Sequence, residues 1–292
     1  MAKKLQTIQG RCLRVVAGAY RATSTEALEA ETHVEPLDLY AGKVAMKAVA
    51  RNTLTDAYQG VRKRVEGILR GRSRRGRTPR HRGPLQKITA YVESKSAKRL
   101  ERAQGTEDEV SSAHRKLLKE VKTAIDKDSA DRWQKRWTSS EKGQHSRELQ
   151  PILTRKAFLN HAQLRRPQSS LMIQLRTGKI GFRSFLHERK VPGFDDPRCQ
   201  DCDEGPEMTV EHVLLHCERW SGLREECFAR GLQEATRPSL KALLGTKKGC
   251  HAAVEMVWRT GILAQFSTSD LEDIGAVEED EEIVEEGEDG VA

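Results

Sequence analysis

Four residues in the C-terminal half have the types and the spacing of a metal site. Cys199, Cys202, His212 and Cys217 form the pattern C-x2-C-x9-H-x4-C. Three thiolates and one imidazole complete a tetrahedral zinc set, and an x2 spacing lets two sulfurs of one tight turn converge on an ion. A Gly-Pro step between the two pairs reverses the chain. The pattern predicts one structural Zn²⁺ bound by these four residues.

The second pair of ligands leaves one alternative open. Residues five apart on a regular α-helix point apart, so the last turn must loosen at Cys217 if it joins His212. His216 follows His212 by four residues and shares its helical face without any loosening. Thiolate is the stronger zinc ligand, which favours Cys217. Thr209 is placed to cap the helix that carries His212.

A second constellation is a run of arginines between residues 62 and 87. Eleven Lys/Arg stand there among glycines and prolines, with Glu66 as the single acid. Arginine contacts phosphate oxygens whatever the base sequence and also stacks on unpaired RNA bases, so the run predicts largely sequence-independent binding of RNA or DNA. A solvated linker and a nuclear-import signal are the alternatives. The residues expected to contact phosphates are Arg62, Arg64, Arg70, Arg72, Arg74, Arg75, Arg77, Arg80 and Arg82.

The net charge of +8 conceals two opposite regions. The segment from Asp270 to Ala292 holds twelve Asp/Glu and no Lys/Arg. Outside it, 51 basic residues face 31 acidic ones, an excess of +20. A field of that strength attracts polyanions, of which nucleic acid is the commonest inside cells. The acidic segment, expected to be disordered, would oppose this attraction.

The composition restricts the class of protein. The chain has 292 residues, of which 37% are hydrophobic, 5% aromatic and 32% charged, so one large core is not expected. It contains no run of about 18 apolar residues and begins without an apolar signal stretch, which predicts neither a membrane span nor secretion. The expected location is intracellular, nuclear or cytoplasmic, where the six cysteines are thiols or metal ligands.

Apolar residues recur at helical spacing in the first 61 residues. Leu5, Ile8, Cys12 and Val15 or Val16 form one expected buried face of a helix that ends at Gly18. A capping box of Thr23 and Glu26 precedes a short helix from Thr25 to Glu31. A longer helix from about Asp38 has its own apolar stripe, which consists of Leu39, Met46, Ala50, Leu54, Ala57 and Val61.

Helical spacing returns after the arginine run, at Val110, Ala113, Leu117, Val121 and Ile125. Trp133 and Trp137 lie one turn apart and are expected in a helical core, with stacking on bases as the alternative. Further helices are expected from about Ser169 to Arg189 and around His251 to Phe266. Cys12 and Cys250 are expected in the core, with Cys227 as a reserve ligand.

No segment alternates with period two, so the predicted fold class is mostly α. It comprises helical segments, a small zinc-binding module, a basic linker and a disordered acidic tail. The expected boundaries are a helical segment at 1–61, the basic linker at 62–106, a helical region at 107–190, the zinc-binding module at 191–230, C-terminal helices at 231–269 and the tail at 270–292.

Two stretches resemble a known family. Residues 8–21 (IQGRCLRVVAGAYR) and 35–39 (EPLDL) resemble the segment that follows the polymerase domain in fungal non-LTR retrotransposon reverse transcriptases. Residues 174–181 (QLRTGKIG), 191–195 (VPGFD) and 211–217 (EHVLLHC), with the first cysteine pair, resemble their C-terminal zinc-binding module. The two stretches cover about half of the chain. The resemblance implies a post-polymerase helical segment followed by a CCHC-type zinc module.

The catalytic parts of that family are not recognisable in this sequence. No Tyr/Phe-Ala-Asp-Asp motif is present, and Asp195-Asp196 stands in a Pro/Gly loop typical of turn chemistry. No spaced carboxylates suit the two-metal chemistry of ribonuclease H. The prediction is therefore a non-catalytic nucleic-acid-binding and zinc-binding fragment, not an enzyme. The alternatives are a protein-interaction adaptor, or part of an RNA-directed DNA polymerase whose catalytic domain lies on a missing upstream segment.

Overall fold

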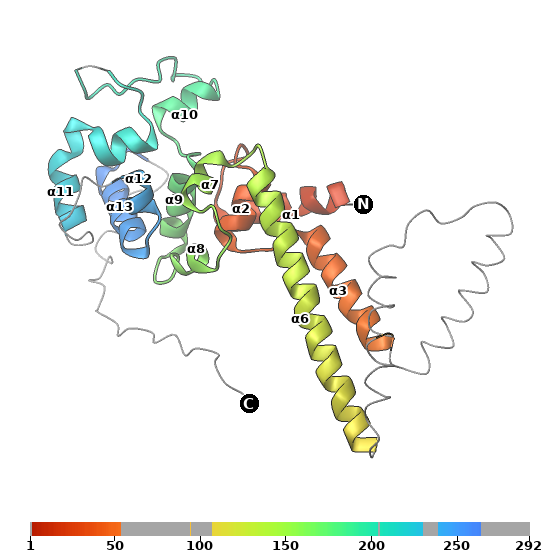
Figure 1. The fold of residues 1–292 in the computed structure, drawn as a ribbon. Coiled ribbons are helices and arrows are strands. Elements are labelled where there is room, and N and C mark those ends of the chain that lie inside the picture. Colours follow the sequence, from red (N-terminus) through yellow and green to blue (C-terminus); the bar gives the residue numbers. More distant parts are fainter. Residues whose placement is uncertain (1, 54–93, 95–106, 204, 230–238, 264–292) are drawn as a thin grey trace, which may run out of the picture. The chain divides into compact units, whose positions relative to one another are not determined.

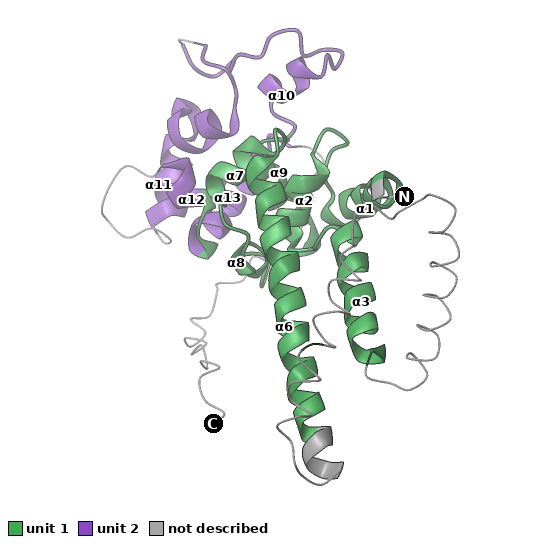
Figure 2. Ribbon diagram, turned by 45° about the vertical axis from the view of Figure 1, so that its right-hand side comes forward, with its two compact units in different colours: residues 1–180, 244–247 green, residues 181–243, 248–292 purple. Residues whose placement is uncertain are grey.

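The computed structural model describes residues 2–53, 94, 107–203, 205–229 and 239–263 (Figure 1). These residues are mostly helical, as predicted, and the one β-bridge among them pairs Arg198 with Glu207. They divide into two compact units, residues 1–180 with 244–247 and residues 181–243 with 248–292 (Figure 2). The division after residue 180 falls inside the predicted helical region 107–190. The basic linker and the acidic tail lie outside the described residues.

The helices of unit 1 are α1 (Ala2–Ala17), α2 (Thr25–Thr32), α3 (Leu37–Asn52), α6 (Glu107–Ser139), α7 (Gln144–Leu149), α8 (Lys156–Leu159) and α9 (Arg166–Thr177). Those of unit 2 are α10 (Arg183–Glu188), η1 (His212–His216), η2 (Glu218–Trp220) and α11 (Ser221–Ala229), with most of α12 (Leu240–Leu244) and α13 (Lys247–Thr260). No described helix is long and apolar enough to cross a membrane.

The long helix α6 packs lengthwise against α3 (Figure 1). Met46 and Ala50 of α3 meet Leu117, Val121 and Ile125 of α6 in one apolar cluster. These five residues belong to the two predicted stripes, whose buried faces are thereby confirmed. The further stripe positions at 54, 57 and 61 lie outside the described residues.

The two tryptophans of α6 are core residues, as predicted. Trp137 is 2% exposed, packs with Ala27 and Ala30 of α2, and donates its Nε1–H to the carbonyl oxygen of Gln150 at 2.9 Å. Trp133 is buried beside the imidazole of His33. Neither ring is open to a nucleic-acid base.

The predicted buried face of α1 is wrong. Ile8, Val15 and Val16 are 55%, 71% and 67% exposed, and Cys12, expected in the core, is exposed as well. Apolar residues at helical spacing indicate a helix. They do not decide which side of it packs against other helices when the opposite side also carries apolar residues. α1 therefore presents an exposed apolar stripe.

The buried side of α1 consists of Gln9, Gly10, Leu13 and Ala17. Leu13 and Ala17 pack with Leu28 of α2 and Ile173 of α9. One turn earlier, Gly10 lies so close to α2 that a Cβ on it would come within 2.4 Å of the Thr25 hydroxyl oxygen. The lack of a side chain on Gly10 lets the side chain of Thr25 approach α1 closely on this side.

The caps around α2 agree only in part with the prediction. Gly18 ends α1 with φ +58°, in the left-handed region that glycine adopts without strain. The N-cap of α2 is Ser24, whose side chain accepts from the backbone N–H of Ala27 at 3.1 Å. The predicted capping box of Thr23 and Glu26 is therefore wrong: the cap lies one residue later, and Ala27 in the third helical position has no carboxylate to complete a box.

The helix expected from Ser169 to Arg189 is two helices. Gly178 follows α9 with φ +67° and ends it, and α10 begins only at Arg183. The apolar positions of the pattern, Leu171, Leu175, Phe182 and Phe185, are nevertheless buried. α13 begins at Lys247 and ends at Thr260, so both of its ends come earlier than in the predicted span of His251 to Phe266, and Gly261 follows it with φ +65°.

An arginine occupies the core of unit 1. Arg176 is 1% exposed and its Nε donates to Glu31 Oε2 at 2.6 Å, while Glu31 is completely buried. Its other nitrogens donate to the carbonyl oxygen of Leu244 and, at 3.4 Å, to Gln150 Oε1. Burial of this charge is tolerable because a carboxylate and neutral oxygens surround the guanidinium.

A second buried carboxyl in α2, that of Glu29, makes unit 1 sensitive to pH. Burial raises the pKa of Glu29 from 4.5 to about 8, and the negative charge of Glu26 adds to the rise. In the unfolded chain the carboxyl releases its proton near pH 4.5. Between pH 4.5 and pH 8 the folded state therefore keeps a proton that the unfolded state has lost. The contribution of Glu29 to stability is therefore highest below pH 4.5 and falls as the pH rises toward 8.

We expect Glu29→Gln to remove this dependence, because the amide keeps the shape without titrating. Between pH 5 and pH 8, the free energy that protects α2 backbone amides should fall by a few kcal/mol in the wild type and stay flatter in the variant. Hydrogen exchange measures this locally. Glu141→Gln, at an exposed position, is the control. Parallel pH profiles of the wild type and Glu29→Gln would contradict the expectation.

Candidate metal centre

The first two cysteines lie on a tight turn of unit 2. The N–H of Cys199 donates to the carbonyl oxygen of Pro206 at 2.7 Å, and the N–H of Gly205 donates to that of Cys202 at 3.0 Å. Gly205 has φ +55°, a conformation that favours glycine. The chain therefore reverses at the Gly-Pro step, as predicted, and both sulfurs come to one side.

The second pair lies on a helical segment with a widened turn. Thr209 Oγ1 accepts from the N–H of His212 at 3.2 Å, which confirms the predicted cap. From His212 to His216 the backbone forms a π-helical turn, and the N–H of Cys217 donates to the carbonyl oxygen of His212 at 2.7 Å. A π turn joins residues five apart, so Cys217 comes back beside His212. The loosened last turn is thus found as predicted.

The four side chains converge on one point. The ligand atoms of Cys199, Cys202, His212 and Cys217 all lie within 4.8 Å of one another. The Sγ of Cys217 lies 3.9 Å from that of Cys199 and 3.8 Å from that of Cys202, and the Sγ of Cys202 lies 3.6 Å from His212 Nε2. A tetrahedral zinc with Zn–S bonds of about 2.3 Å and Zn–N bonds of about 2.0 Å has S–S edges of about 3.8 Å and S–N edges of about 3.5 Å. The cluster can hold a metal ion, and its dimensions are compatible with zinc.

The alternative ligand lies outside this cluster. His216 is exposed, whereas Cys217 is completely buried. Cys227, the reserve ligand, is buried elsewhere in unit 2, where Arg259 Nη1 lies 3.7 Å from its sulfur. Cys250 is a buried core residue, as predicted. Among the described residues, the cluster is the only group of three or more Cys, His, Asp or Glu side chains that meets as a metal site would require.

Burial sets the protonation of the ligands when no metal is bound. Removal from water, followed by the hydrogen bond with Cys202 and the charge of Cys199, raises the pKa of Cys217 to about 12. Burial lowers the pKa of His212, with the nearby His216 adding to the effect, and so favours the neutral imidazole that metals bind. A divalent cation favours thiolate and would compensate the buried negative charge.

An arginine that the sequence analysis missed fixes the π turn from outside. Arg224 of α11 donates from Nε to the carbonyl oxygen of Leu214 at 2.8 Å and from Nη2 to that of Cys217 at 2.7 Å. These oxygens lie at the end of the π turn, where carbonyl groups lack a full set of helical hydrogen bonds, and the N–H of Trp220 also donates to the carbonyl oxygen of Cys217 at 3.3 Å. Arg224 therefore holds the ligand-bearing turn in place. The sequence offers one weak indication of this role, which is that Arg224 follows Cys217 by only seven residues.

The remaining predicted site residues have different outcomes. The nine arginines of the basic linker lie outside the described residues, so their contact with phosphate stays a prediction. The Asp195-Asp196 pair forms a turn, because Asp196 Oδ1 accepts from the N–H of Arg198 at 3.0 Å. This confirms the interpretation of that pair as turn chemistry.

Comparisons with protein-family models, curated proteins and solved structures gave no match. The resemblance to fungal non-LTR retrotransposon reverse transcriptases stays a prediction from the residues that carry it.

Proposed function

We propose that the chain is a non-catalytic nucleic-acid-binding protein whose unit 2 is held together by one structural Zn²⁺. The ligand set supports zinc, because three thiolates and an imidazole are the donors that zinc prefers. It supports a structural role, because the protein fills all four positions and leaves none for water or substrate. In this proposal the chain corresponds to the C-terminal part of a retrotransposon reverse transcriptase.

A hollow beside the metal cluster is the observation that carries binding of nucleic acid. It has a volume of about 360 Å³ and is lined by Phe194, Trp220, Arg183 and Arg219, together with Asp201 from the cysteine turn. The guanidinium carbons lie over the aromatic rings, Arg183 at 5.7 Å from Phe194 and Arg219 at 4.9 Å from Trp220. Arginine and aromatic rings side by side are typical of surfaces on which unpaired bases stack.

Two donors in this hollow have no partner. Arg183 Nε and Trp220 Nε1 are buried without a hydrogen bond. Buried polar groups are nearly always paired, so such donors call for an acceptor from outside. The edges of nucleic-acid bases carry the needed carbonyl oxygens and ring nitrogens. The hollow thus offers aromatic rings and guanidinium groups for stacking, and the unpaired donors of two residues in its lining agree with a ligand that supplies acceptors.

A salt-titrated binding measurement tests the proposal on the full chain. Fluorescence anisotropy with single-stranded RNA and DNA should give an affinity that falls steeply with added salt. Replacing Arg72, Arg74, Arg75 and Arg77 by Ala should flatten the log–log salt slope by about 3, since each phosphate contact contributes about 0.7 to 0.9. The matched control replaces four basic residues that are exposed on α6, Arg115, Lys116, Lys119 and Lys127.

The base-stacking part of the proposal has its own variant in the same measurement. Trp220→Ala should weaken binding about tenfold or more at every salt concentration, because stacking is not screened. The control is Phe158→Ala, an exposed ring with Arg155 over it in unit 1. An affinity that neither salt nor these variants change would overturn the proposal.

One observation favours a second candidate, a protein-interaction adaptor. The exposed stripe of Ile8, Val15 and Val16 on α1 is apolar surface of the kind that partners cover. Docking of a protein through such a stripe buries apolar area and lacks the steep salt slope of phosphate binding. If the chain binds neither RNA nor DNA even at low salt, the result favours the adaptor.

A further inference from the structure

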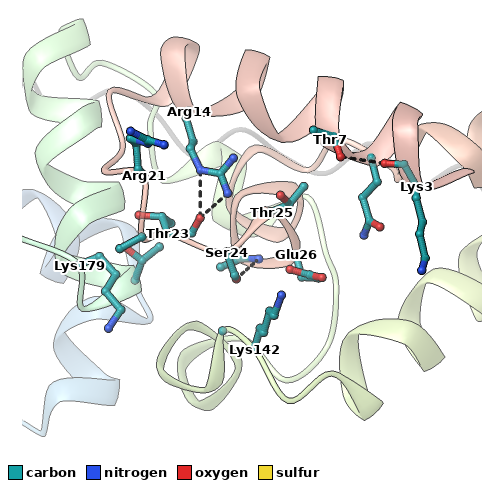
Figure 3. A pocket seen from close by; sticks show the side chains of 15 residues that line it. Lys3, Thr7, Arg14, Arg21, Thr23, Ser24, Thr25, Glu26, Lys142 and Lys179 are labelled. Atoms are coloured by element: carbon teal, nitrogen blue, oxygen red, sulfur yellow. Dashed lines mark hydrogen bonds between the residues drawn. The ribbon is translucent and has the colours of Figure 1, made fainter. Parts of the chain in front are cut away.

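Several basic side chains gather around one hollow in unit 1 (Figure 3). It has a volume of about 720 Å³ and lies where α1, the start of α2, the loop after α6 and the turn after α9 meet. Its single acidic residue is Glu26. Its basic residues, which together define the basic pocket, are Lys3, Arg14, Arg21, Lys142 and Lys179.

The basic residues reach the pocket from separate parts of the sequence. Arg14 is oriented by its neighbours, since its Nε and Nη2 donate to the carbonyl oxygen of Thr23 at 3.2 and 2.8 Å. A carbonyl is a neutral acceptor, so these bonds fix the guanidinium and leave its charge in place. Arg21 and Lys142 are exposed and make no ion pair with a described carboxylate. The lining carries a net charge of about +4, which favours an anion.

The start of α2 adds donors to the same pocket. Ser24 caps this eight-residue helix, and the residues of its first turn, Thr25 to Ala27, line the hollow. The N-terminal end of a helix carries a partial positive charge and backbone N–H groups that suit phosphate. Figure 3 shows the side chains of Thr25 and Glu26 in the same hollow as Lys142.

A buried hydroxyl in the lining has no partner. Thr23 is 1% exposed, and its Oγ1 has no hydrogen bond. A hydroxyl in such a position is nearly always paired in folded proteins, so its lack of a partner is an independent sign of a missing acceptor. The lining thus combines five cations, a helix start and an unsatisfied hydroxyl, and each of these interacts favourably with an oxyanion.

We propose that the basic pocket binds consecutive phosphate groups. Its volume accommodates more than one phosphate, and its cations come from several sides, which suits a chain of phosphates better than one isolated anion. The source that the proposed function favours is the backbone of a bound RNA or DNA strand, and in that respect the inference rests on the proposed function. A free polyphosphate offers the same chemistry, so the two sources are separated by experiment.

The test uses the full chain and two probes. Arg21→Gln/Lys142→Gln removes two charges from the pocket, and Lys119→Gln/Lys127→Gln removes two exposed charges from α6 as the matched control. Inorganic tripolyphosphate is titrated calorimetrically, and single-stranded RNA by anisotropy. We expect the pocket variant to bind tripolyphosphate about tenfold more weakly than the wild type, with the control unchanged. For RNA, its salt slope should fall by about 1.5, because two phosphate contacts are lost.

The outcomes separate the pocket from the proposed function. Equal tripolyphosphate affinity in the pocket variant and the control overturns the pocket as a phosphate site. If the pocket variant binds tripolyphosphate more weakly but binds RNA as the wild type does, the pocket is a phosphate site. The same result overturns nucleic acid as the source of the bound phosphates. If RNA binds to no form of the chain, the proposed function fails, and the tripolyphosphate comparison still decides the pocket. Circular dichroism confirms that both variants are folded.

Discussion

The purified 292-residue chain should contain one zinc, and Cys199→Ser/Cys202→Ser should contain none. Loss of the metal should unfold the segment around η1, because its apolar core is small and the ligand bonds replace the missing hydrophobic stabilisation. Structural zinc contributes about 10 kcal/mol or more to such modules, which is comparable with the whole stability of an ordinary domain. Elemental analysis measures the content, and hydrogen exchange of residues 205–229 measures the unfolding.

The identity of the fourth ligand has a separate readout in the same experiment. Cys217→Ser should lose zinc, whereas His216→Ala, which changes an exposed neighbour, should keep it. Cys250→Ser is the control for loss of a buried thiol in unit 2 outside the cluster. Full zinc content in Cys199→Ser/Cys202→Ser would show that the cluster does not hold the metal. Loss in His216→Ala with retention in Cys217→Ser would assign the ligand to His216.

Removal of the buried arginine should destabilise unit 1 by about 3 to 5 kcal/mol. In Arg176→Met the Glu31 carboxylate stays buried without its cation, and the penalty of an uncompensated charge exceeds the loss of the pair itself. The oxygen atoms of Leu244 and Gln150 also lose a donor. Denaturant-dependent hydrogen exchange of α9 measures the loss in unit 1 without interference from unit 2.

A double variant shows whether the loss arises from the unpaired charge. Arg176→Met/Glu31→Leu should recover much of the stability, because two apolar side chains of similar volume replace the pair. The control is Arg136→Met, which breaks a two-pronged pair with Asp38 at 2.9 and 2.7 Å that is partly exposed, and it should lose only about 1 kcal/mol. A larger loss in Arg136→Met than in Arg176→Met would contradict the argument from burial.

The metal cluster was predictable because its chemistry is local. A cysteine pair separated by two residues and a capped helix carrying His212 lie in one short stretch of sequence, so their geometry follows from a turn and a helix start. The choice between Cys217 and His216 depended on the shape of a single turn, which spacing alone left open. Arg224 was missed because nothing in the sequence says which carbonyl oxygens an arginine will reach.

Two physical causes explain these errors in the fold, and the first is that a helical pattern contains no information on the packing partner. The spacing of Ile8, Val15 and Val16 is helical, yet α1 packs through its other side, where Gly10 permits close approach. The buried Arg176 was missed for the same reason, since its partner Glu31 lies 145 residues away. Gly178 ended α9 inside a continuous apolar pattern because the backbone there is left-handed, a property that spacing does not reveal.

The length of α6 sets a scale for any ligand of unit 1. Its 33 residues extend about 50 Å at 1.5 Å per residue. The C-terminal end at Ser139 stands three residues before Lys142 of the basic pocket, and the chain re-enters the described structure at the opposite end, Glu107, after the arginine run. A duplex that touched both ends of this helix would have to be about 15 base pairs long at 3.4 Å per pair. A strand of a few nucleotides is shorter than α6 and cannot reach from one end of this helix to the other.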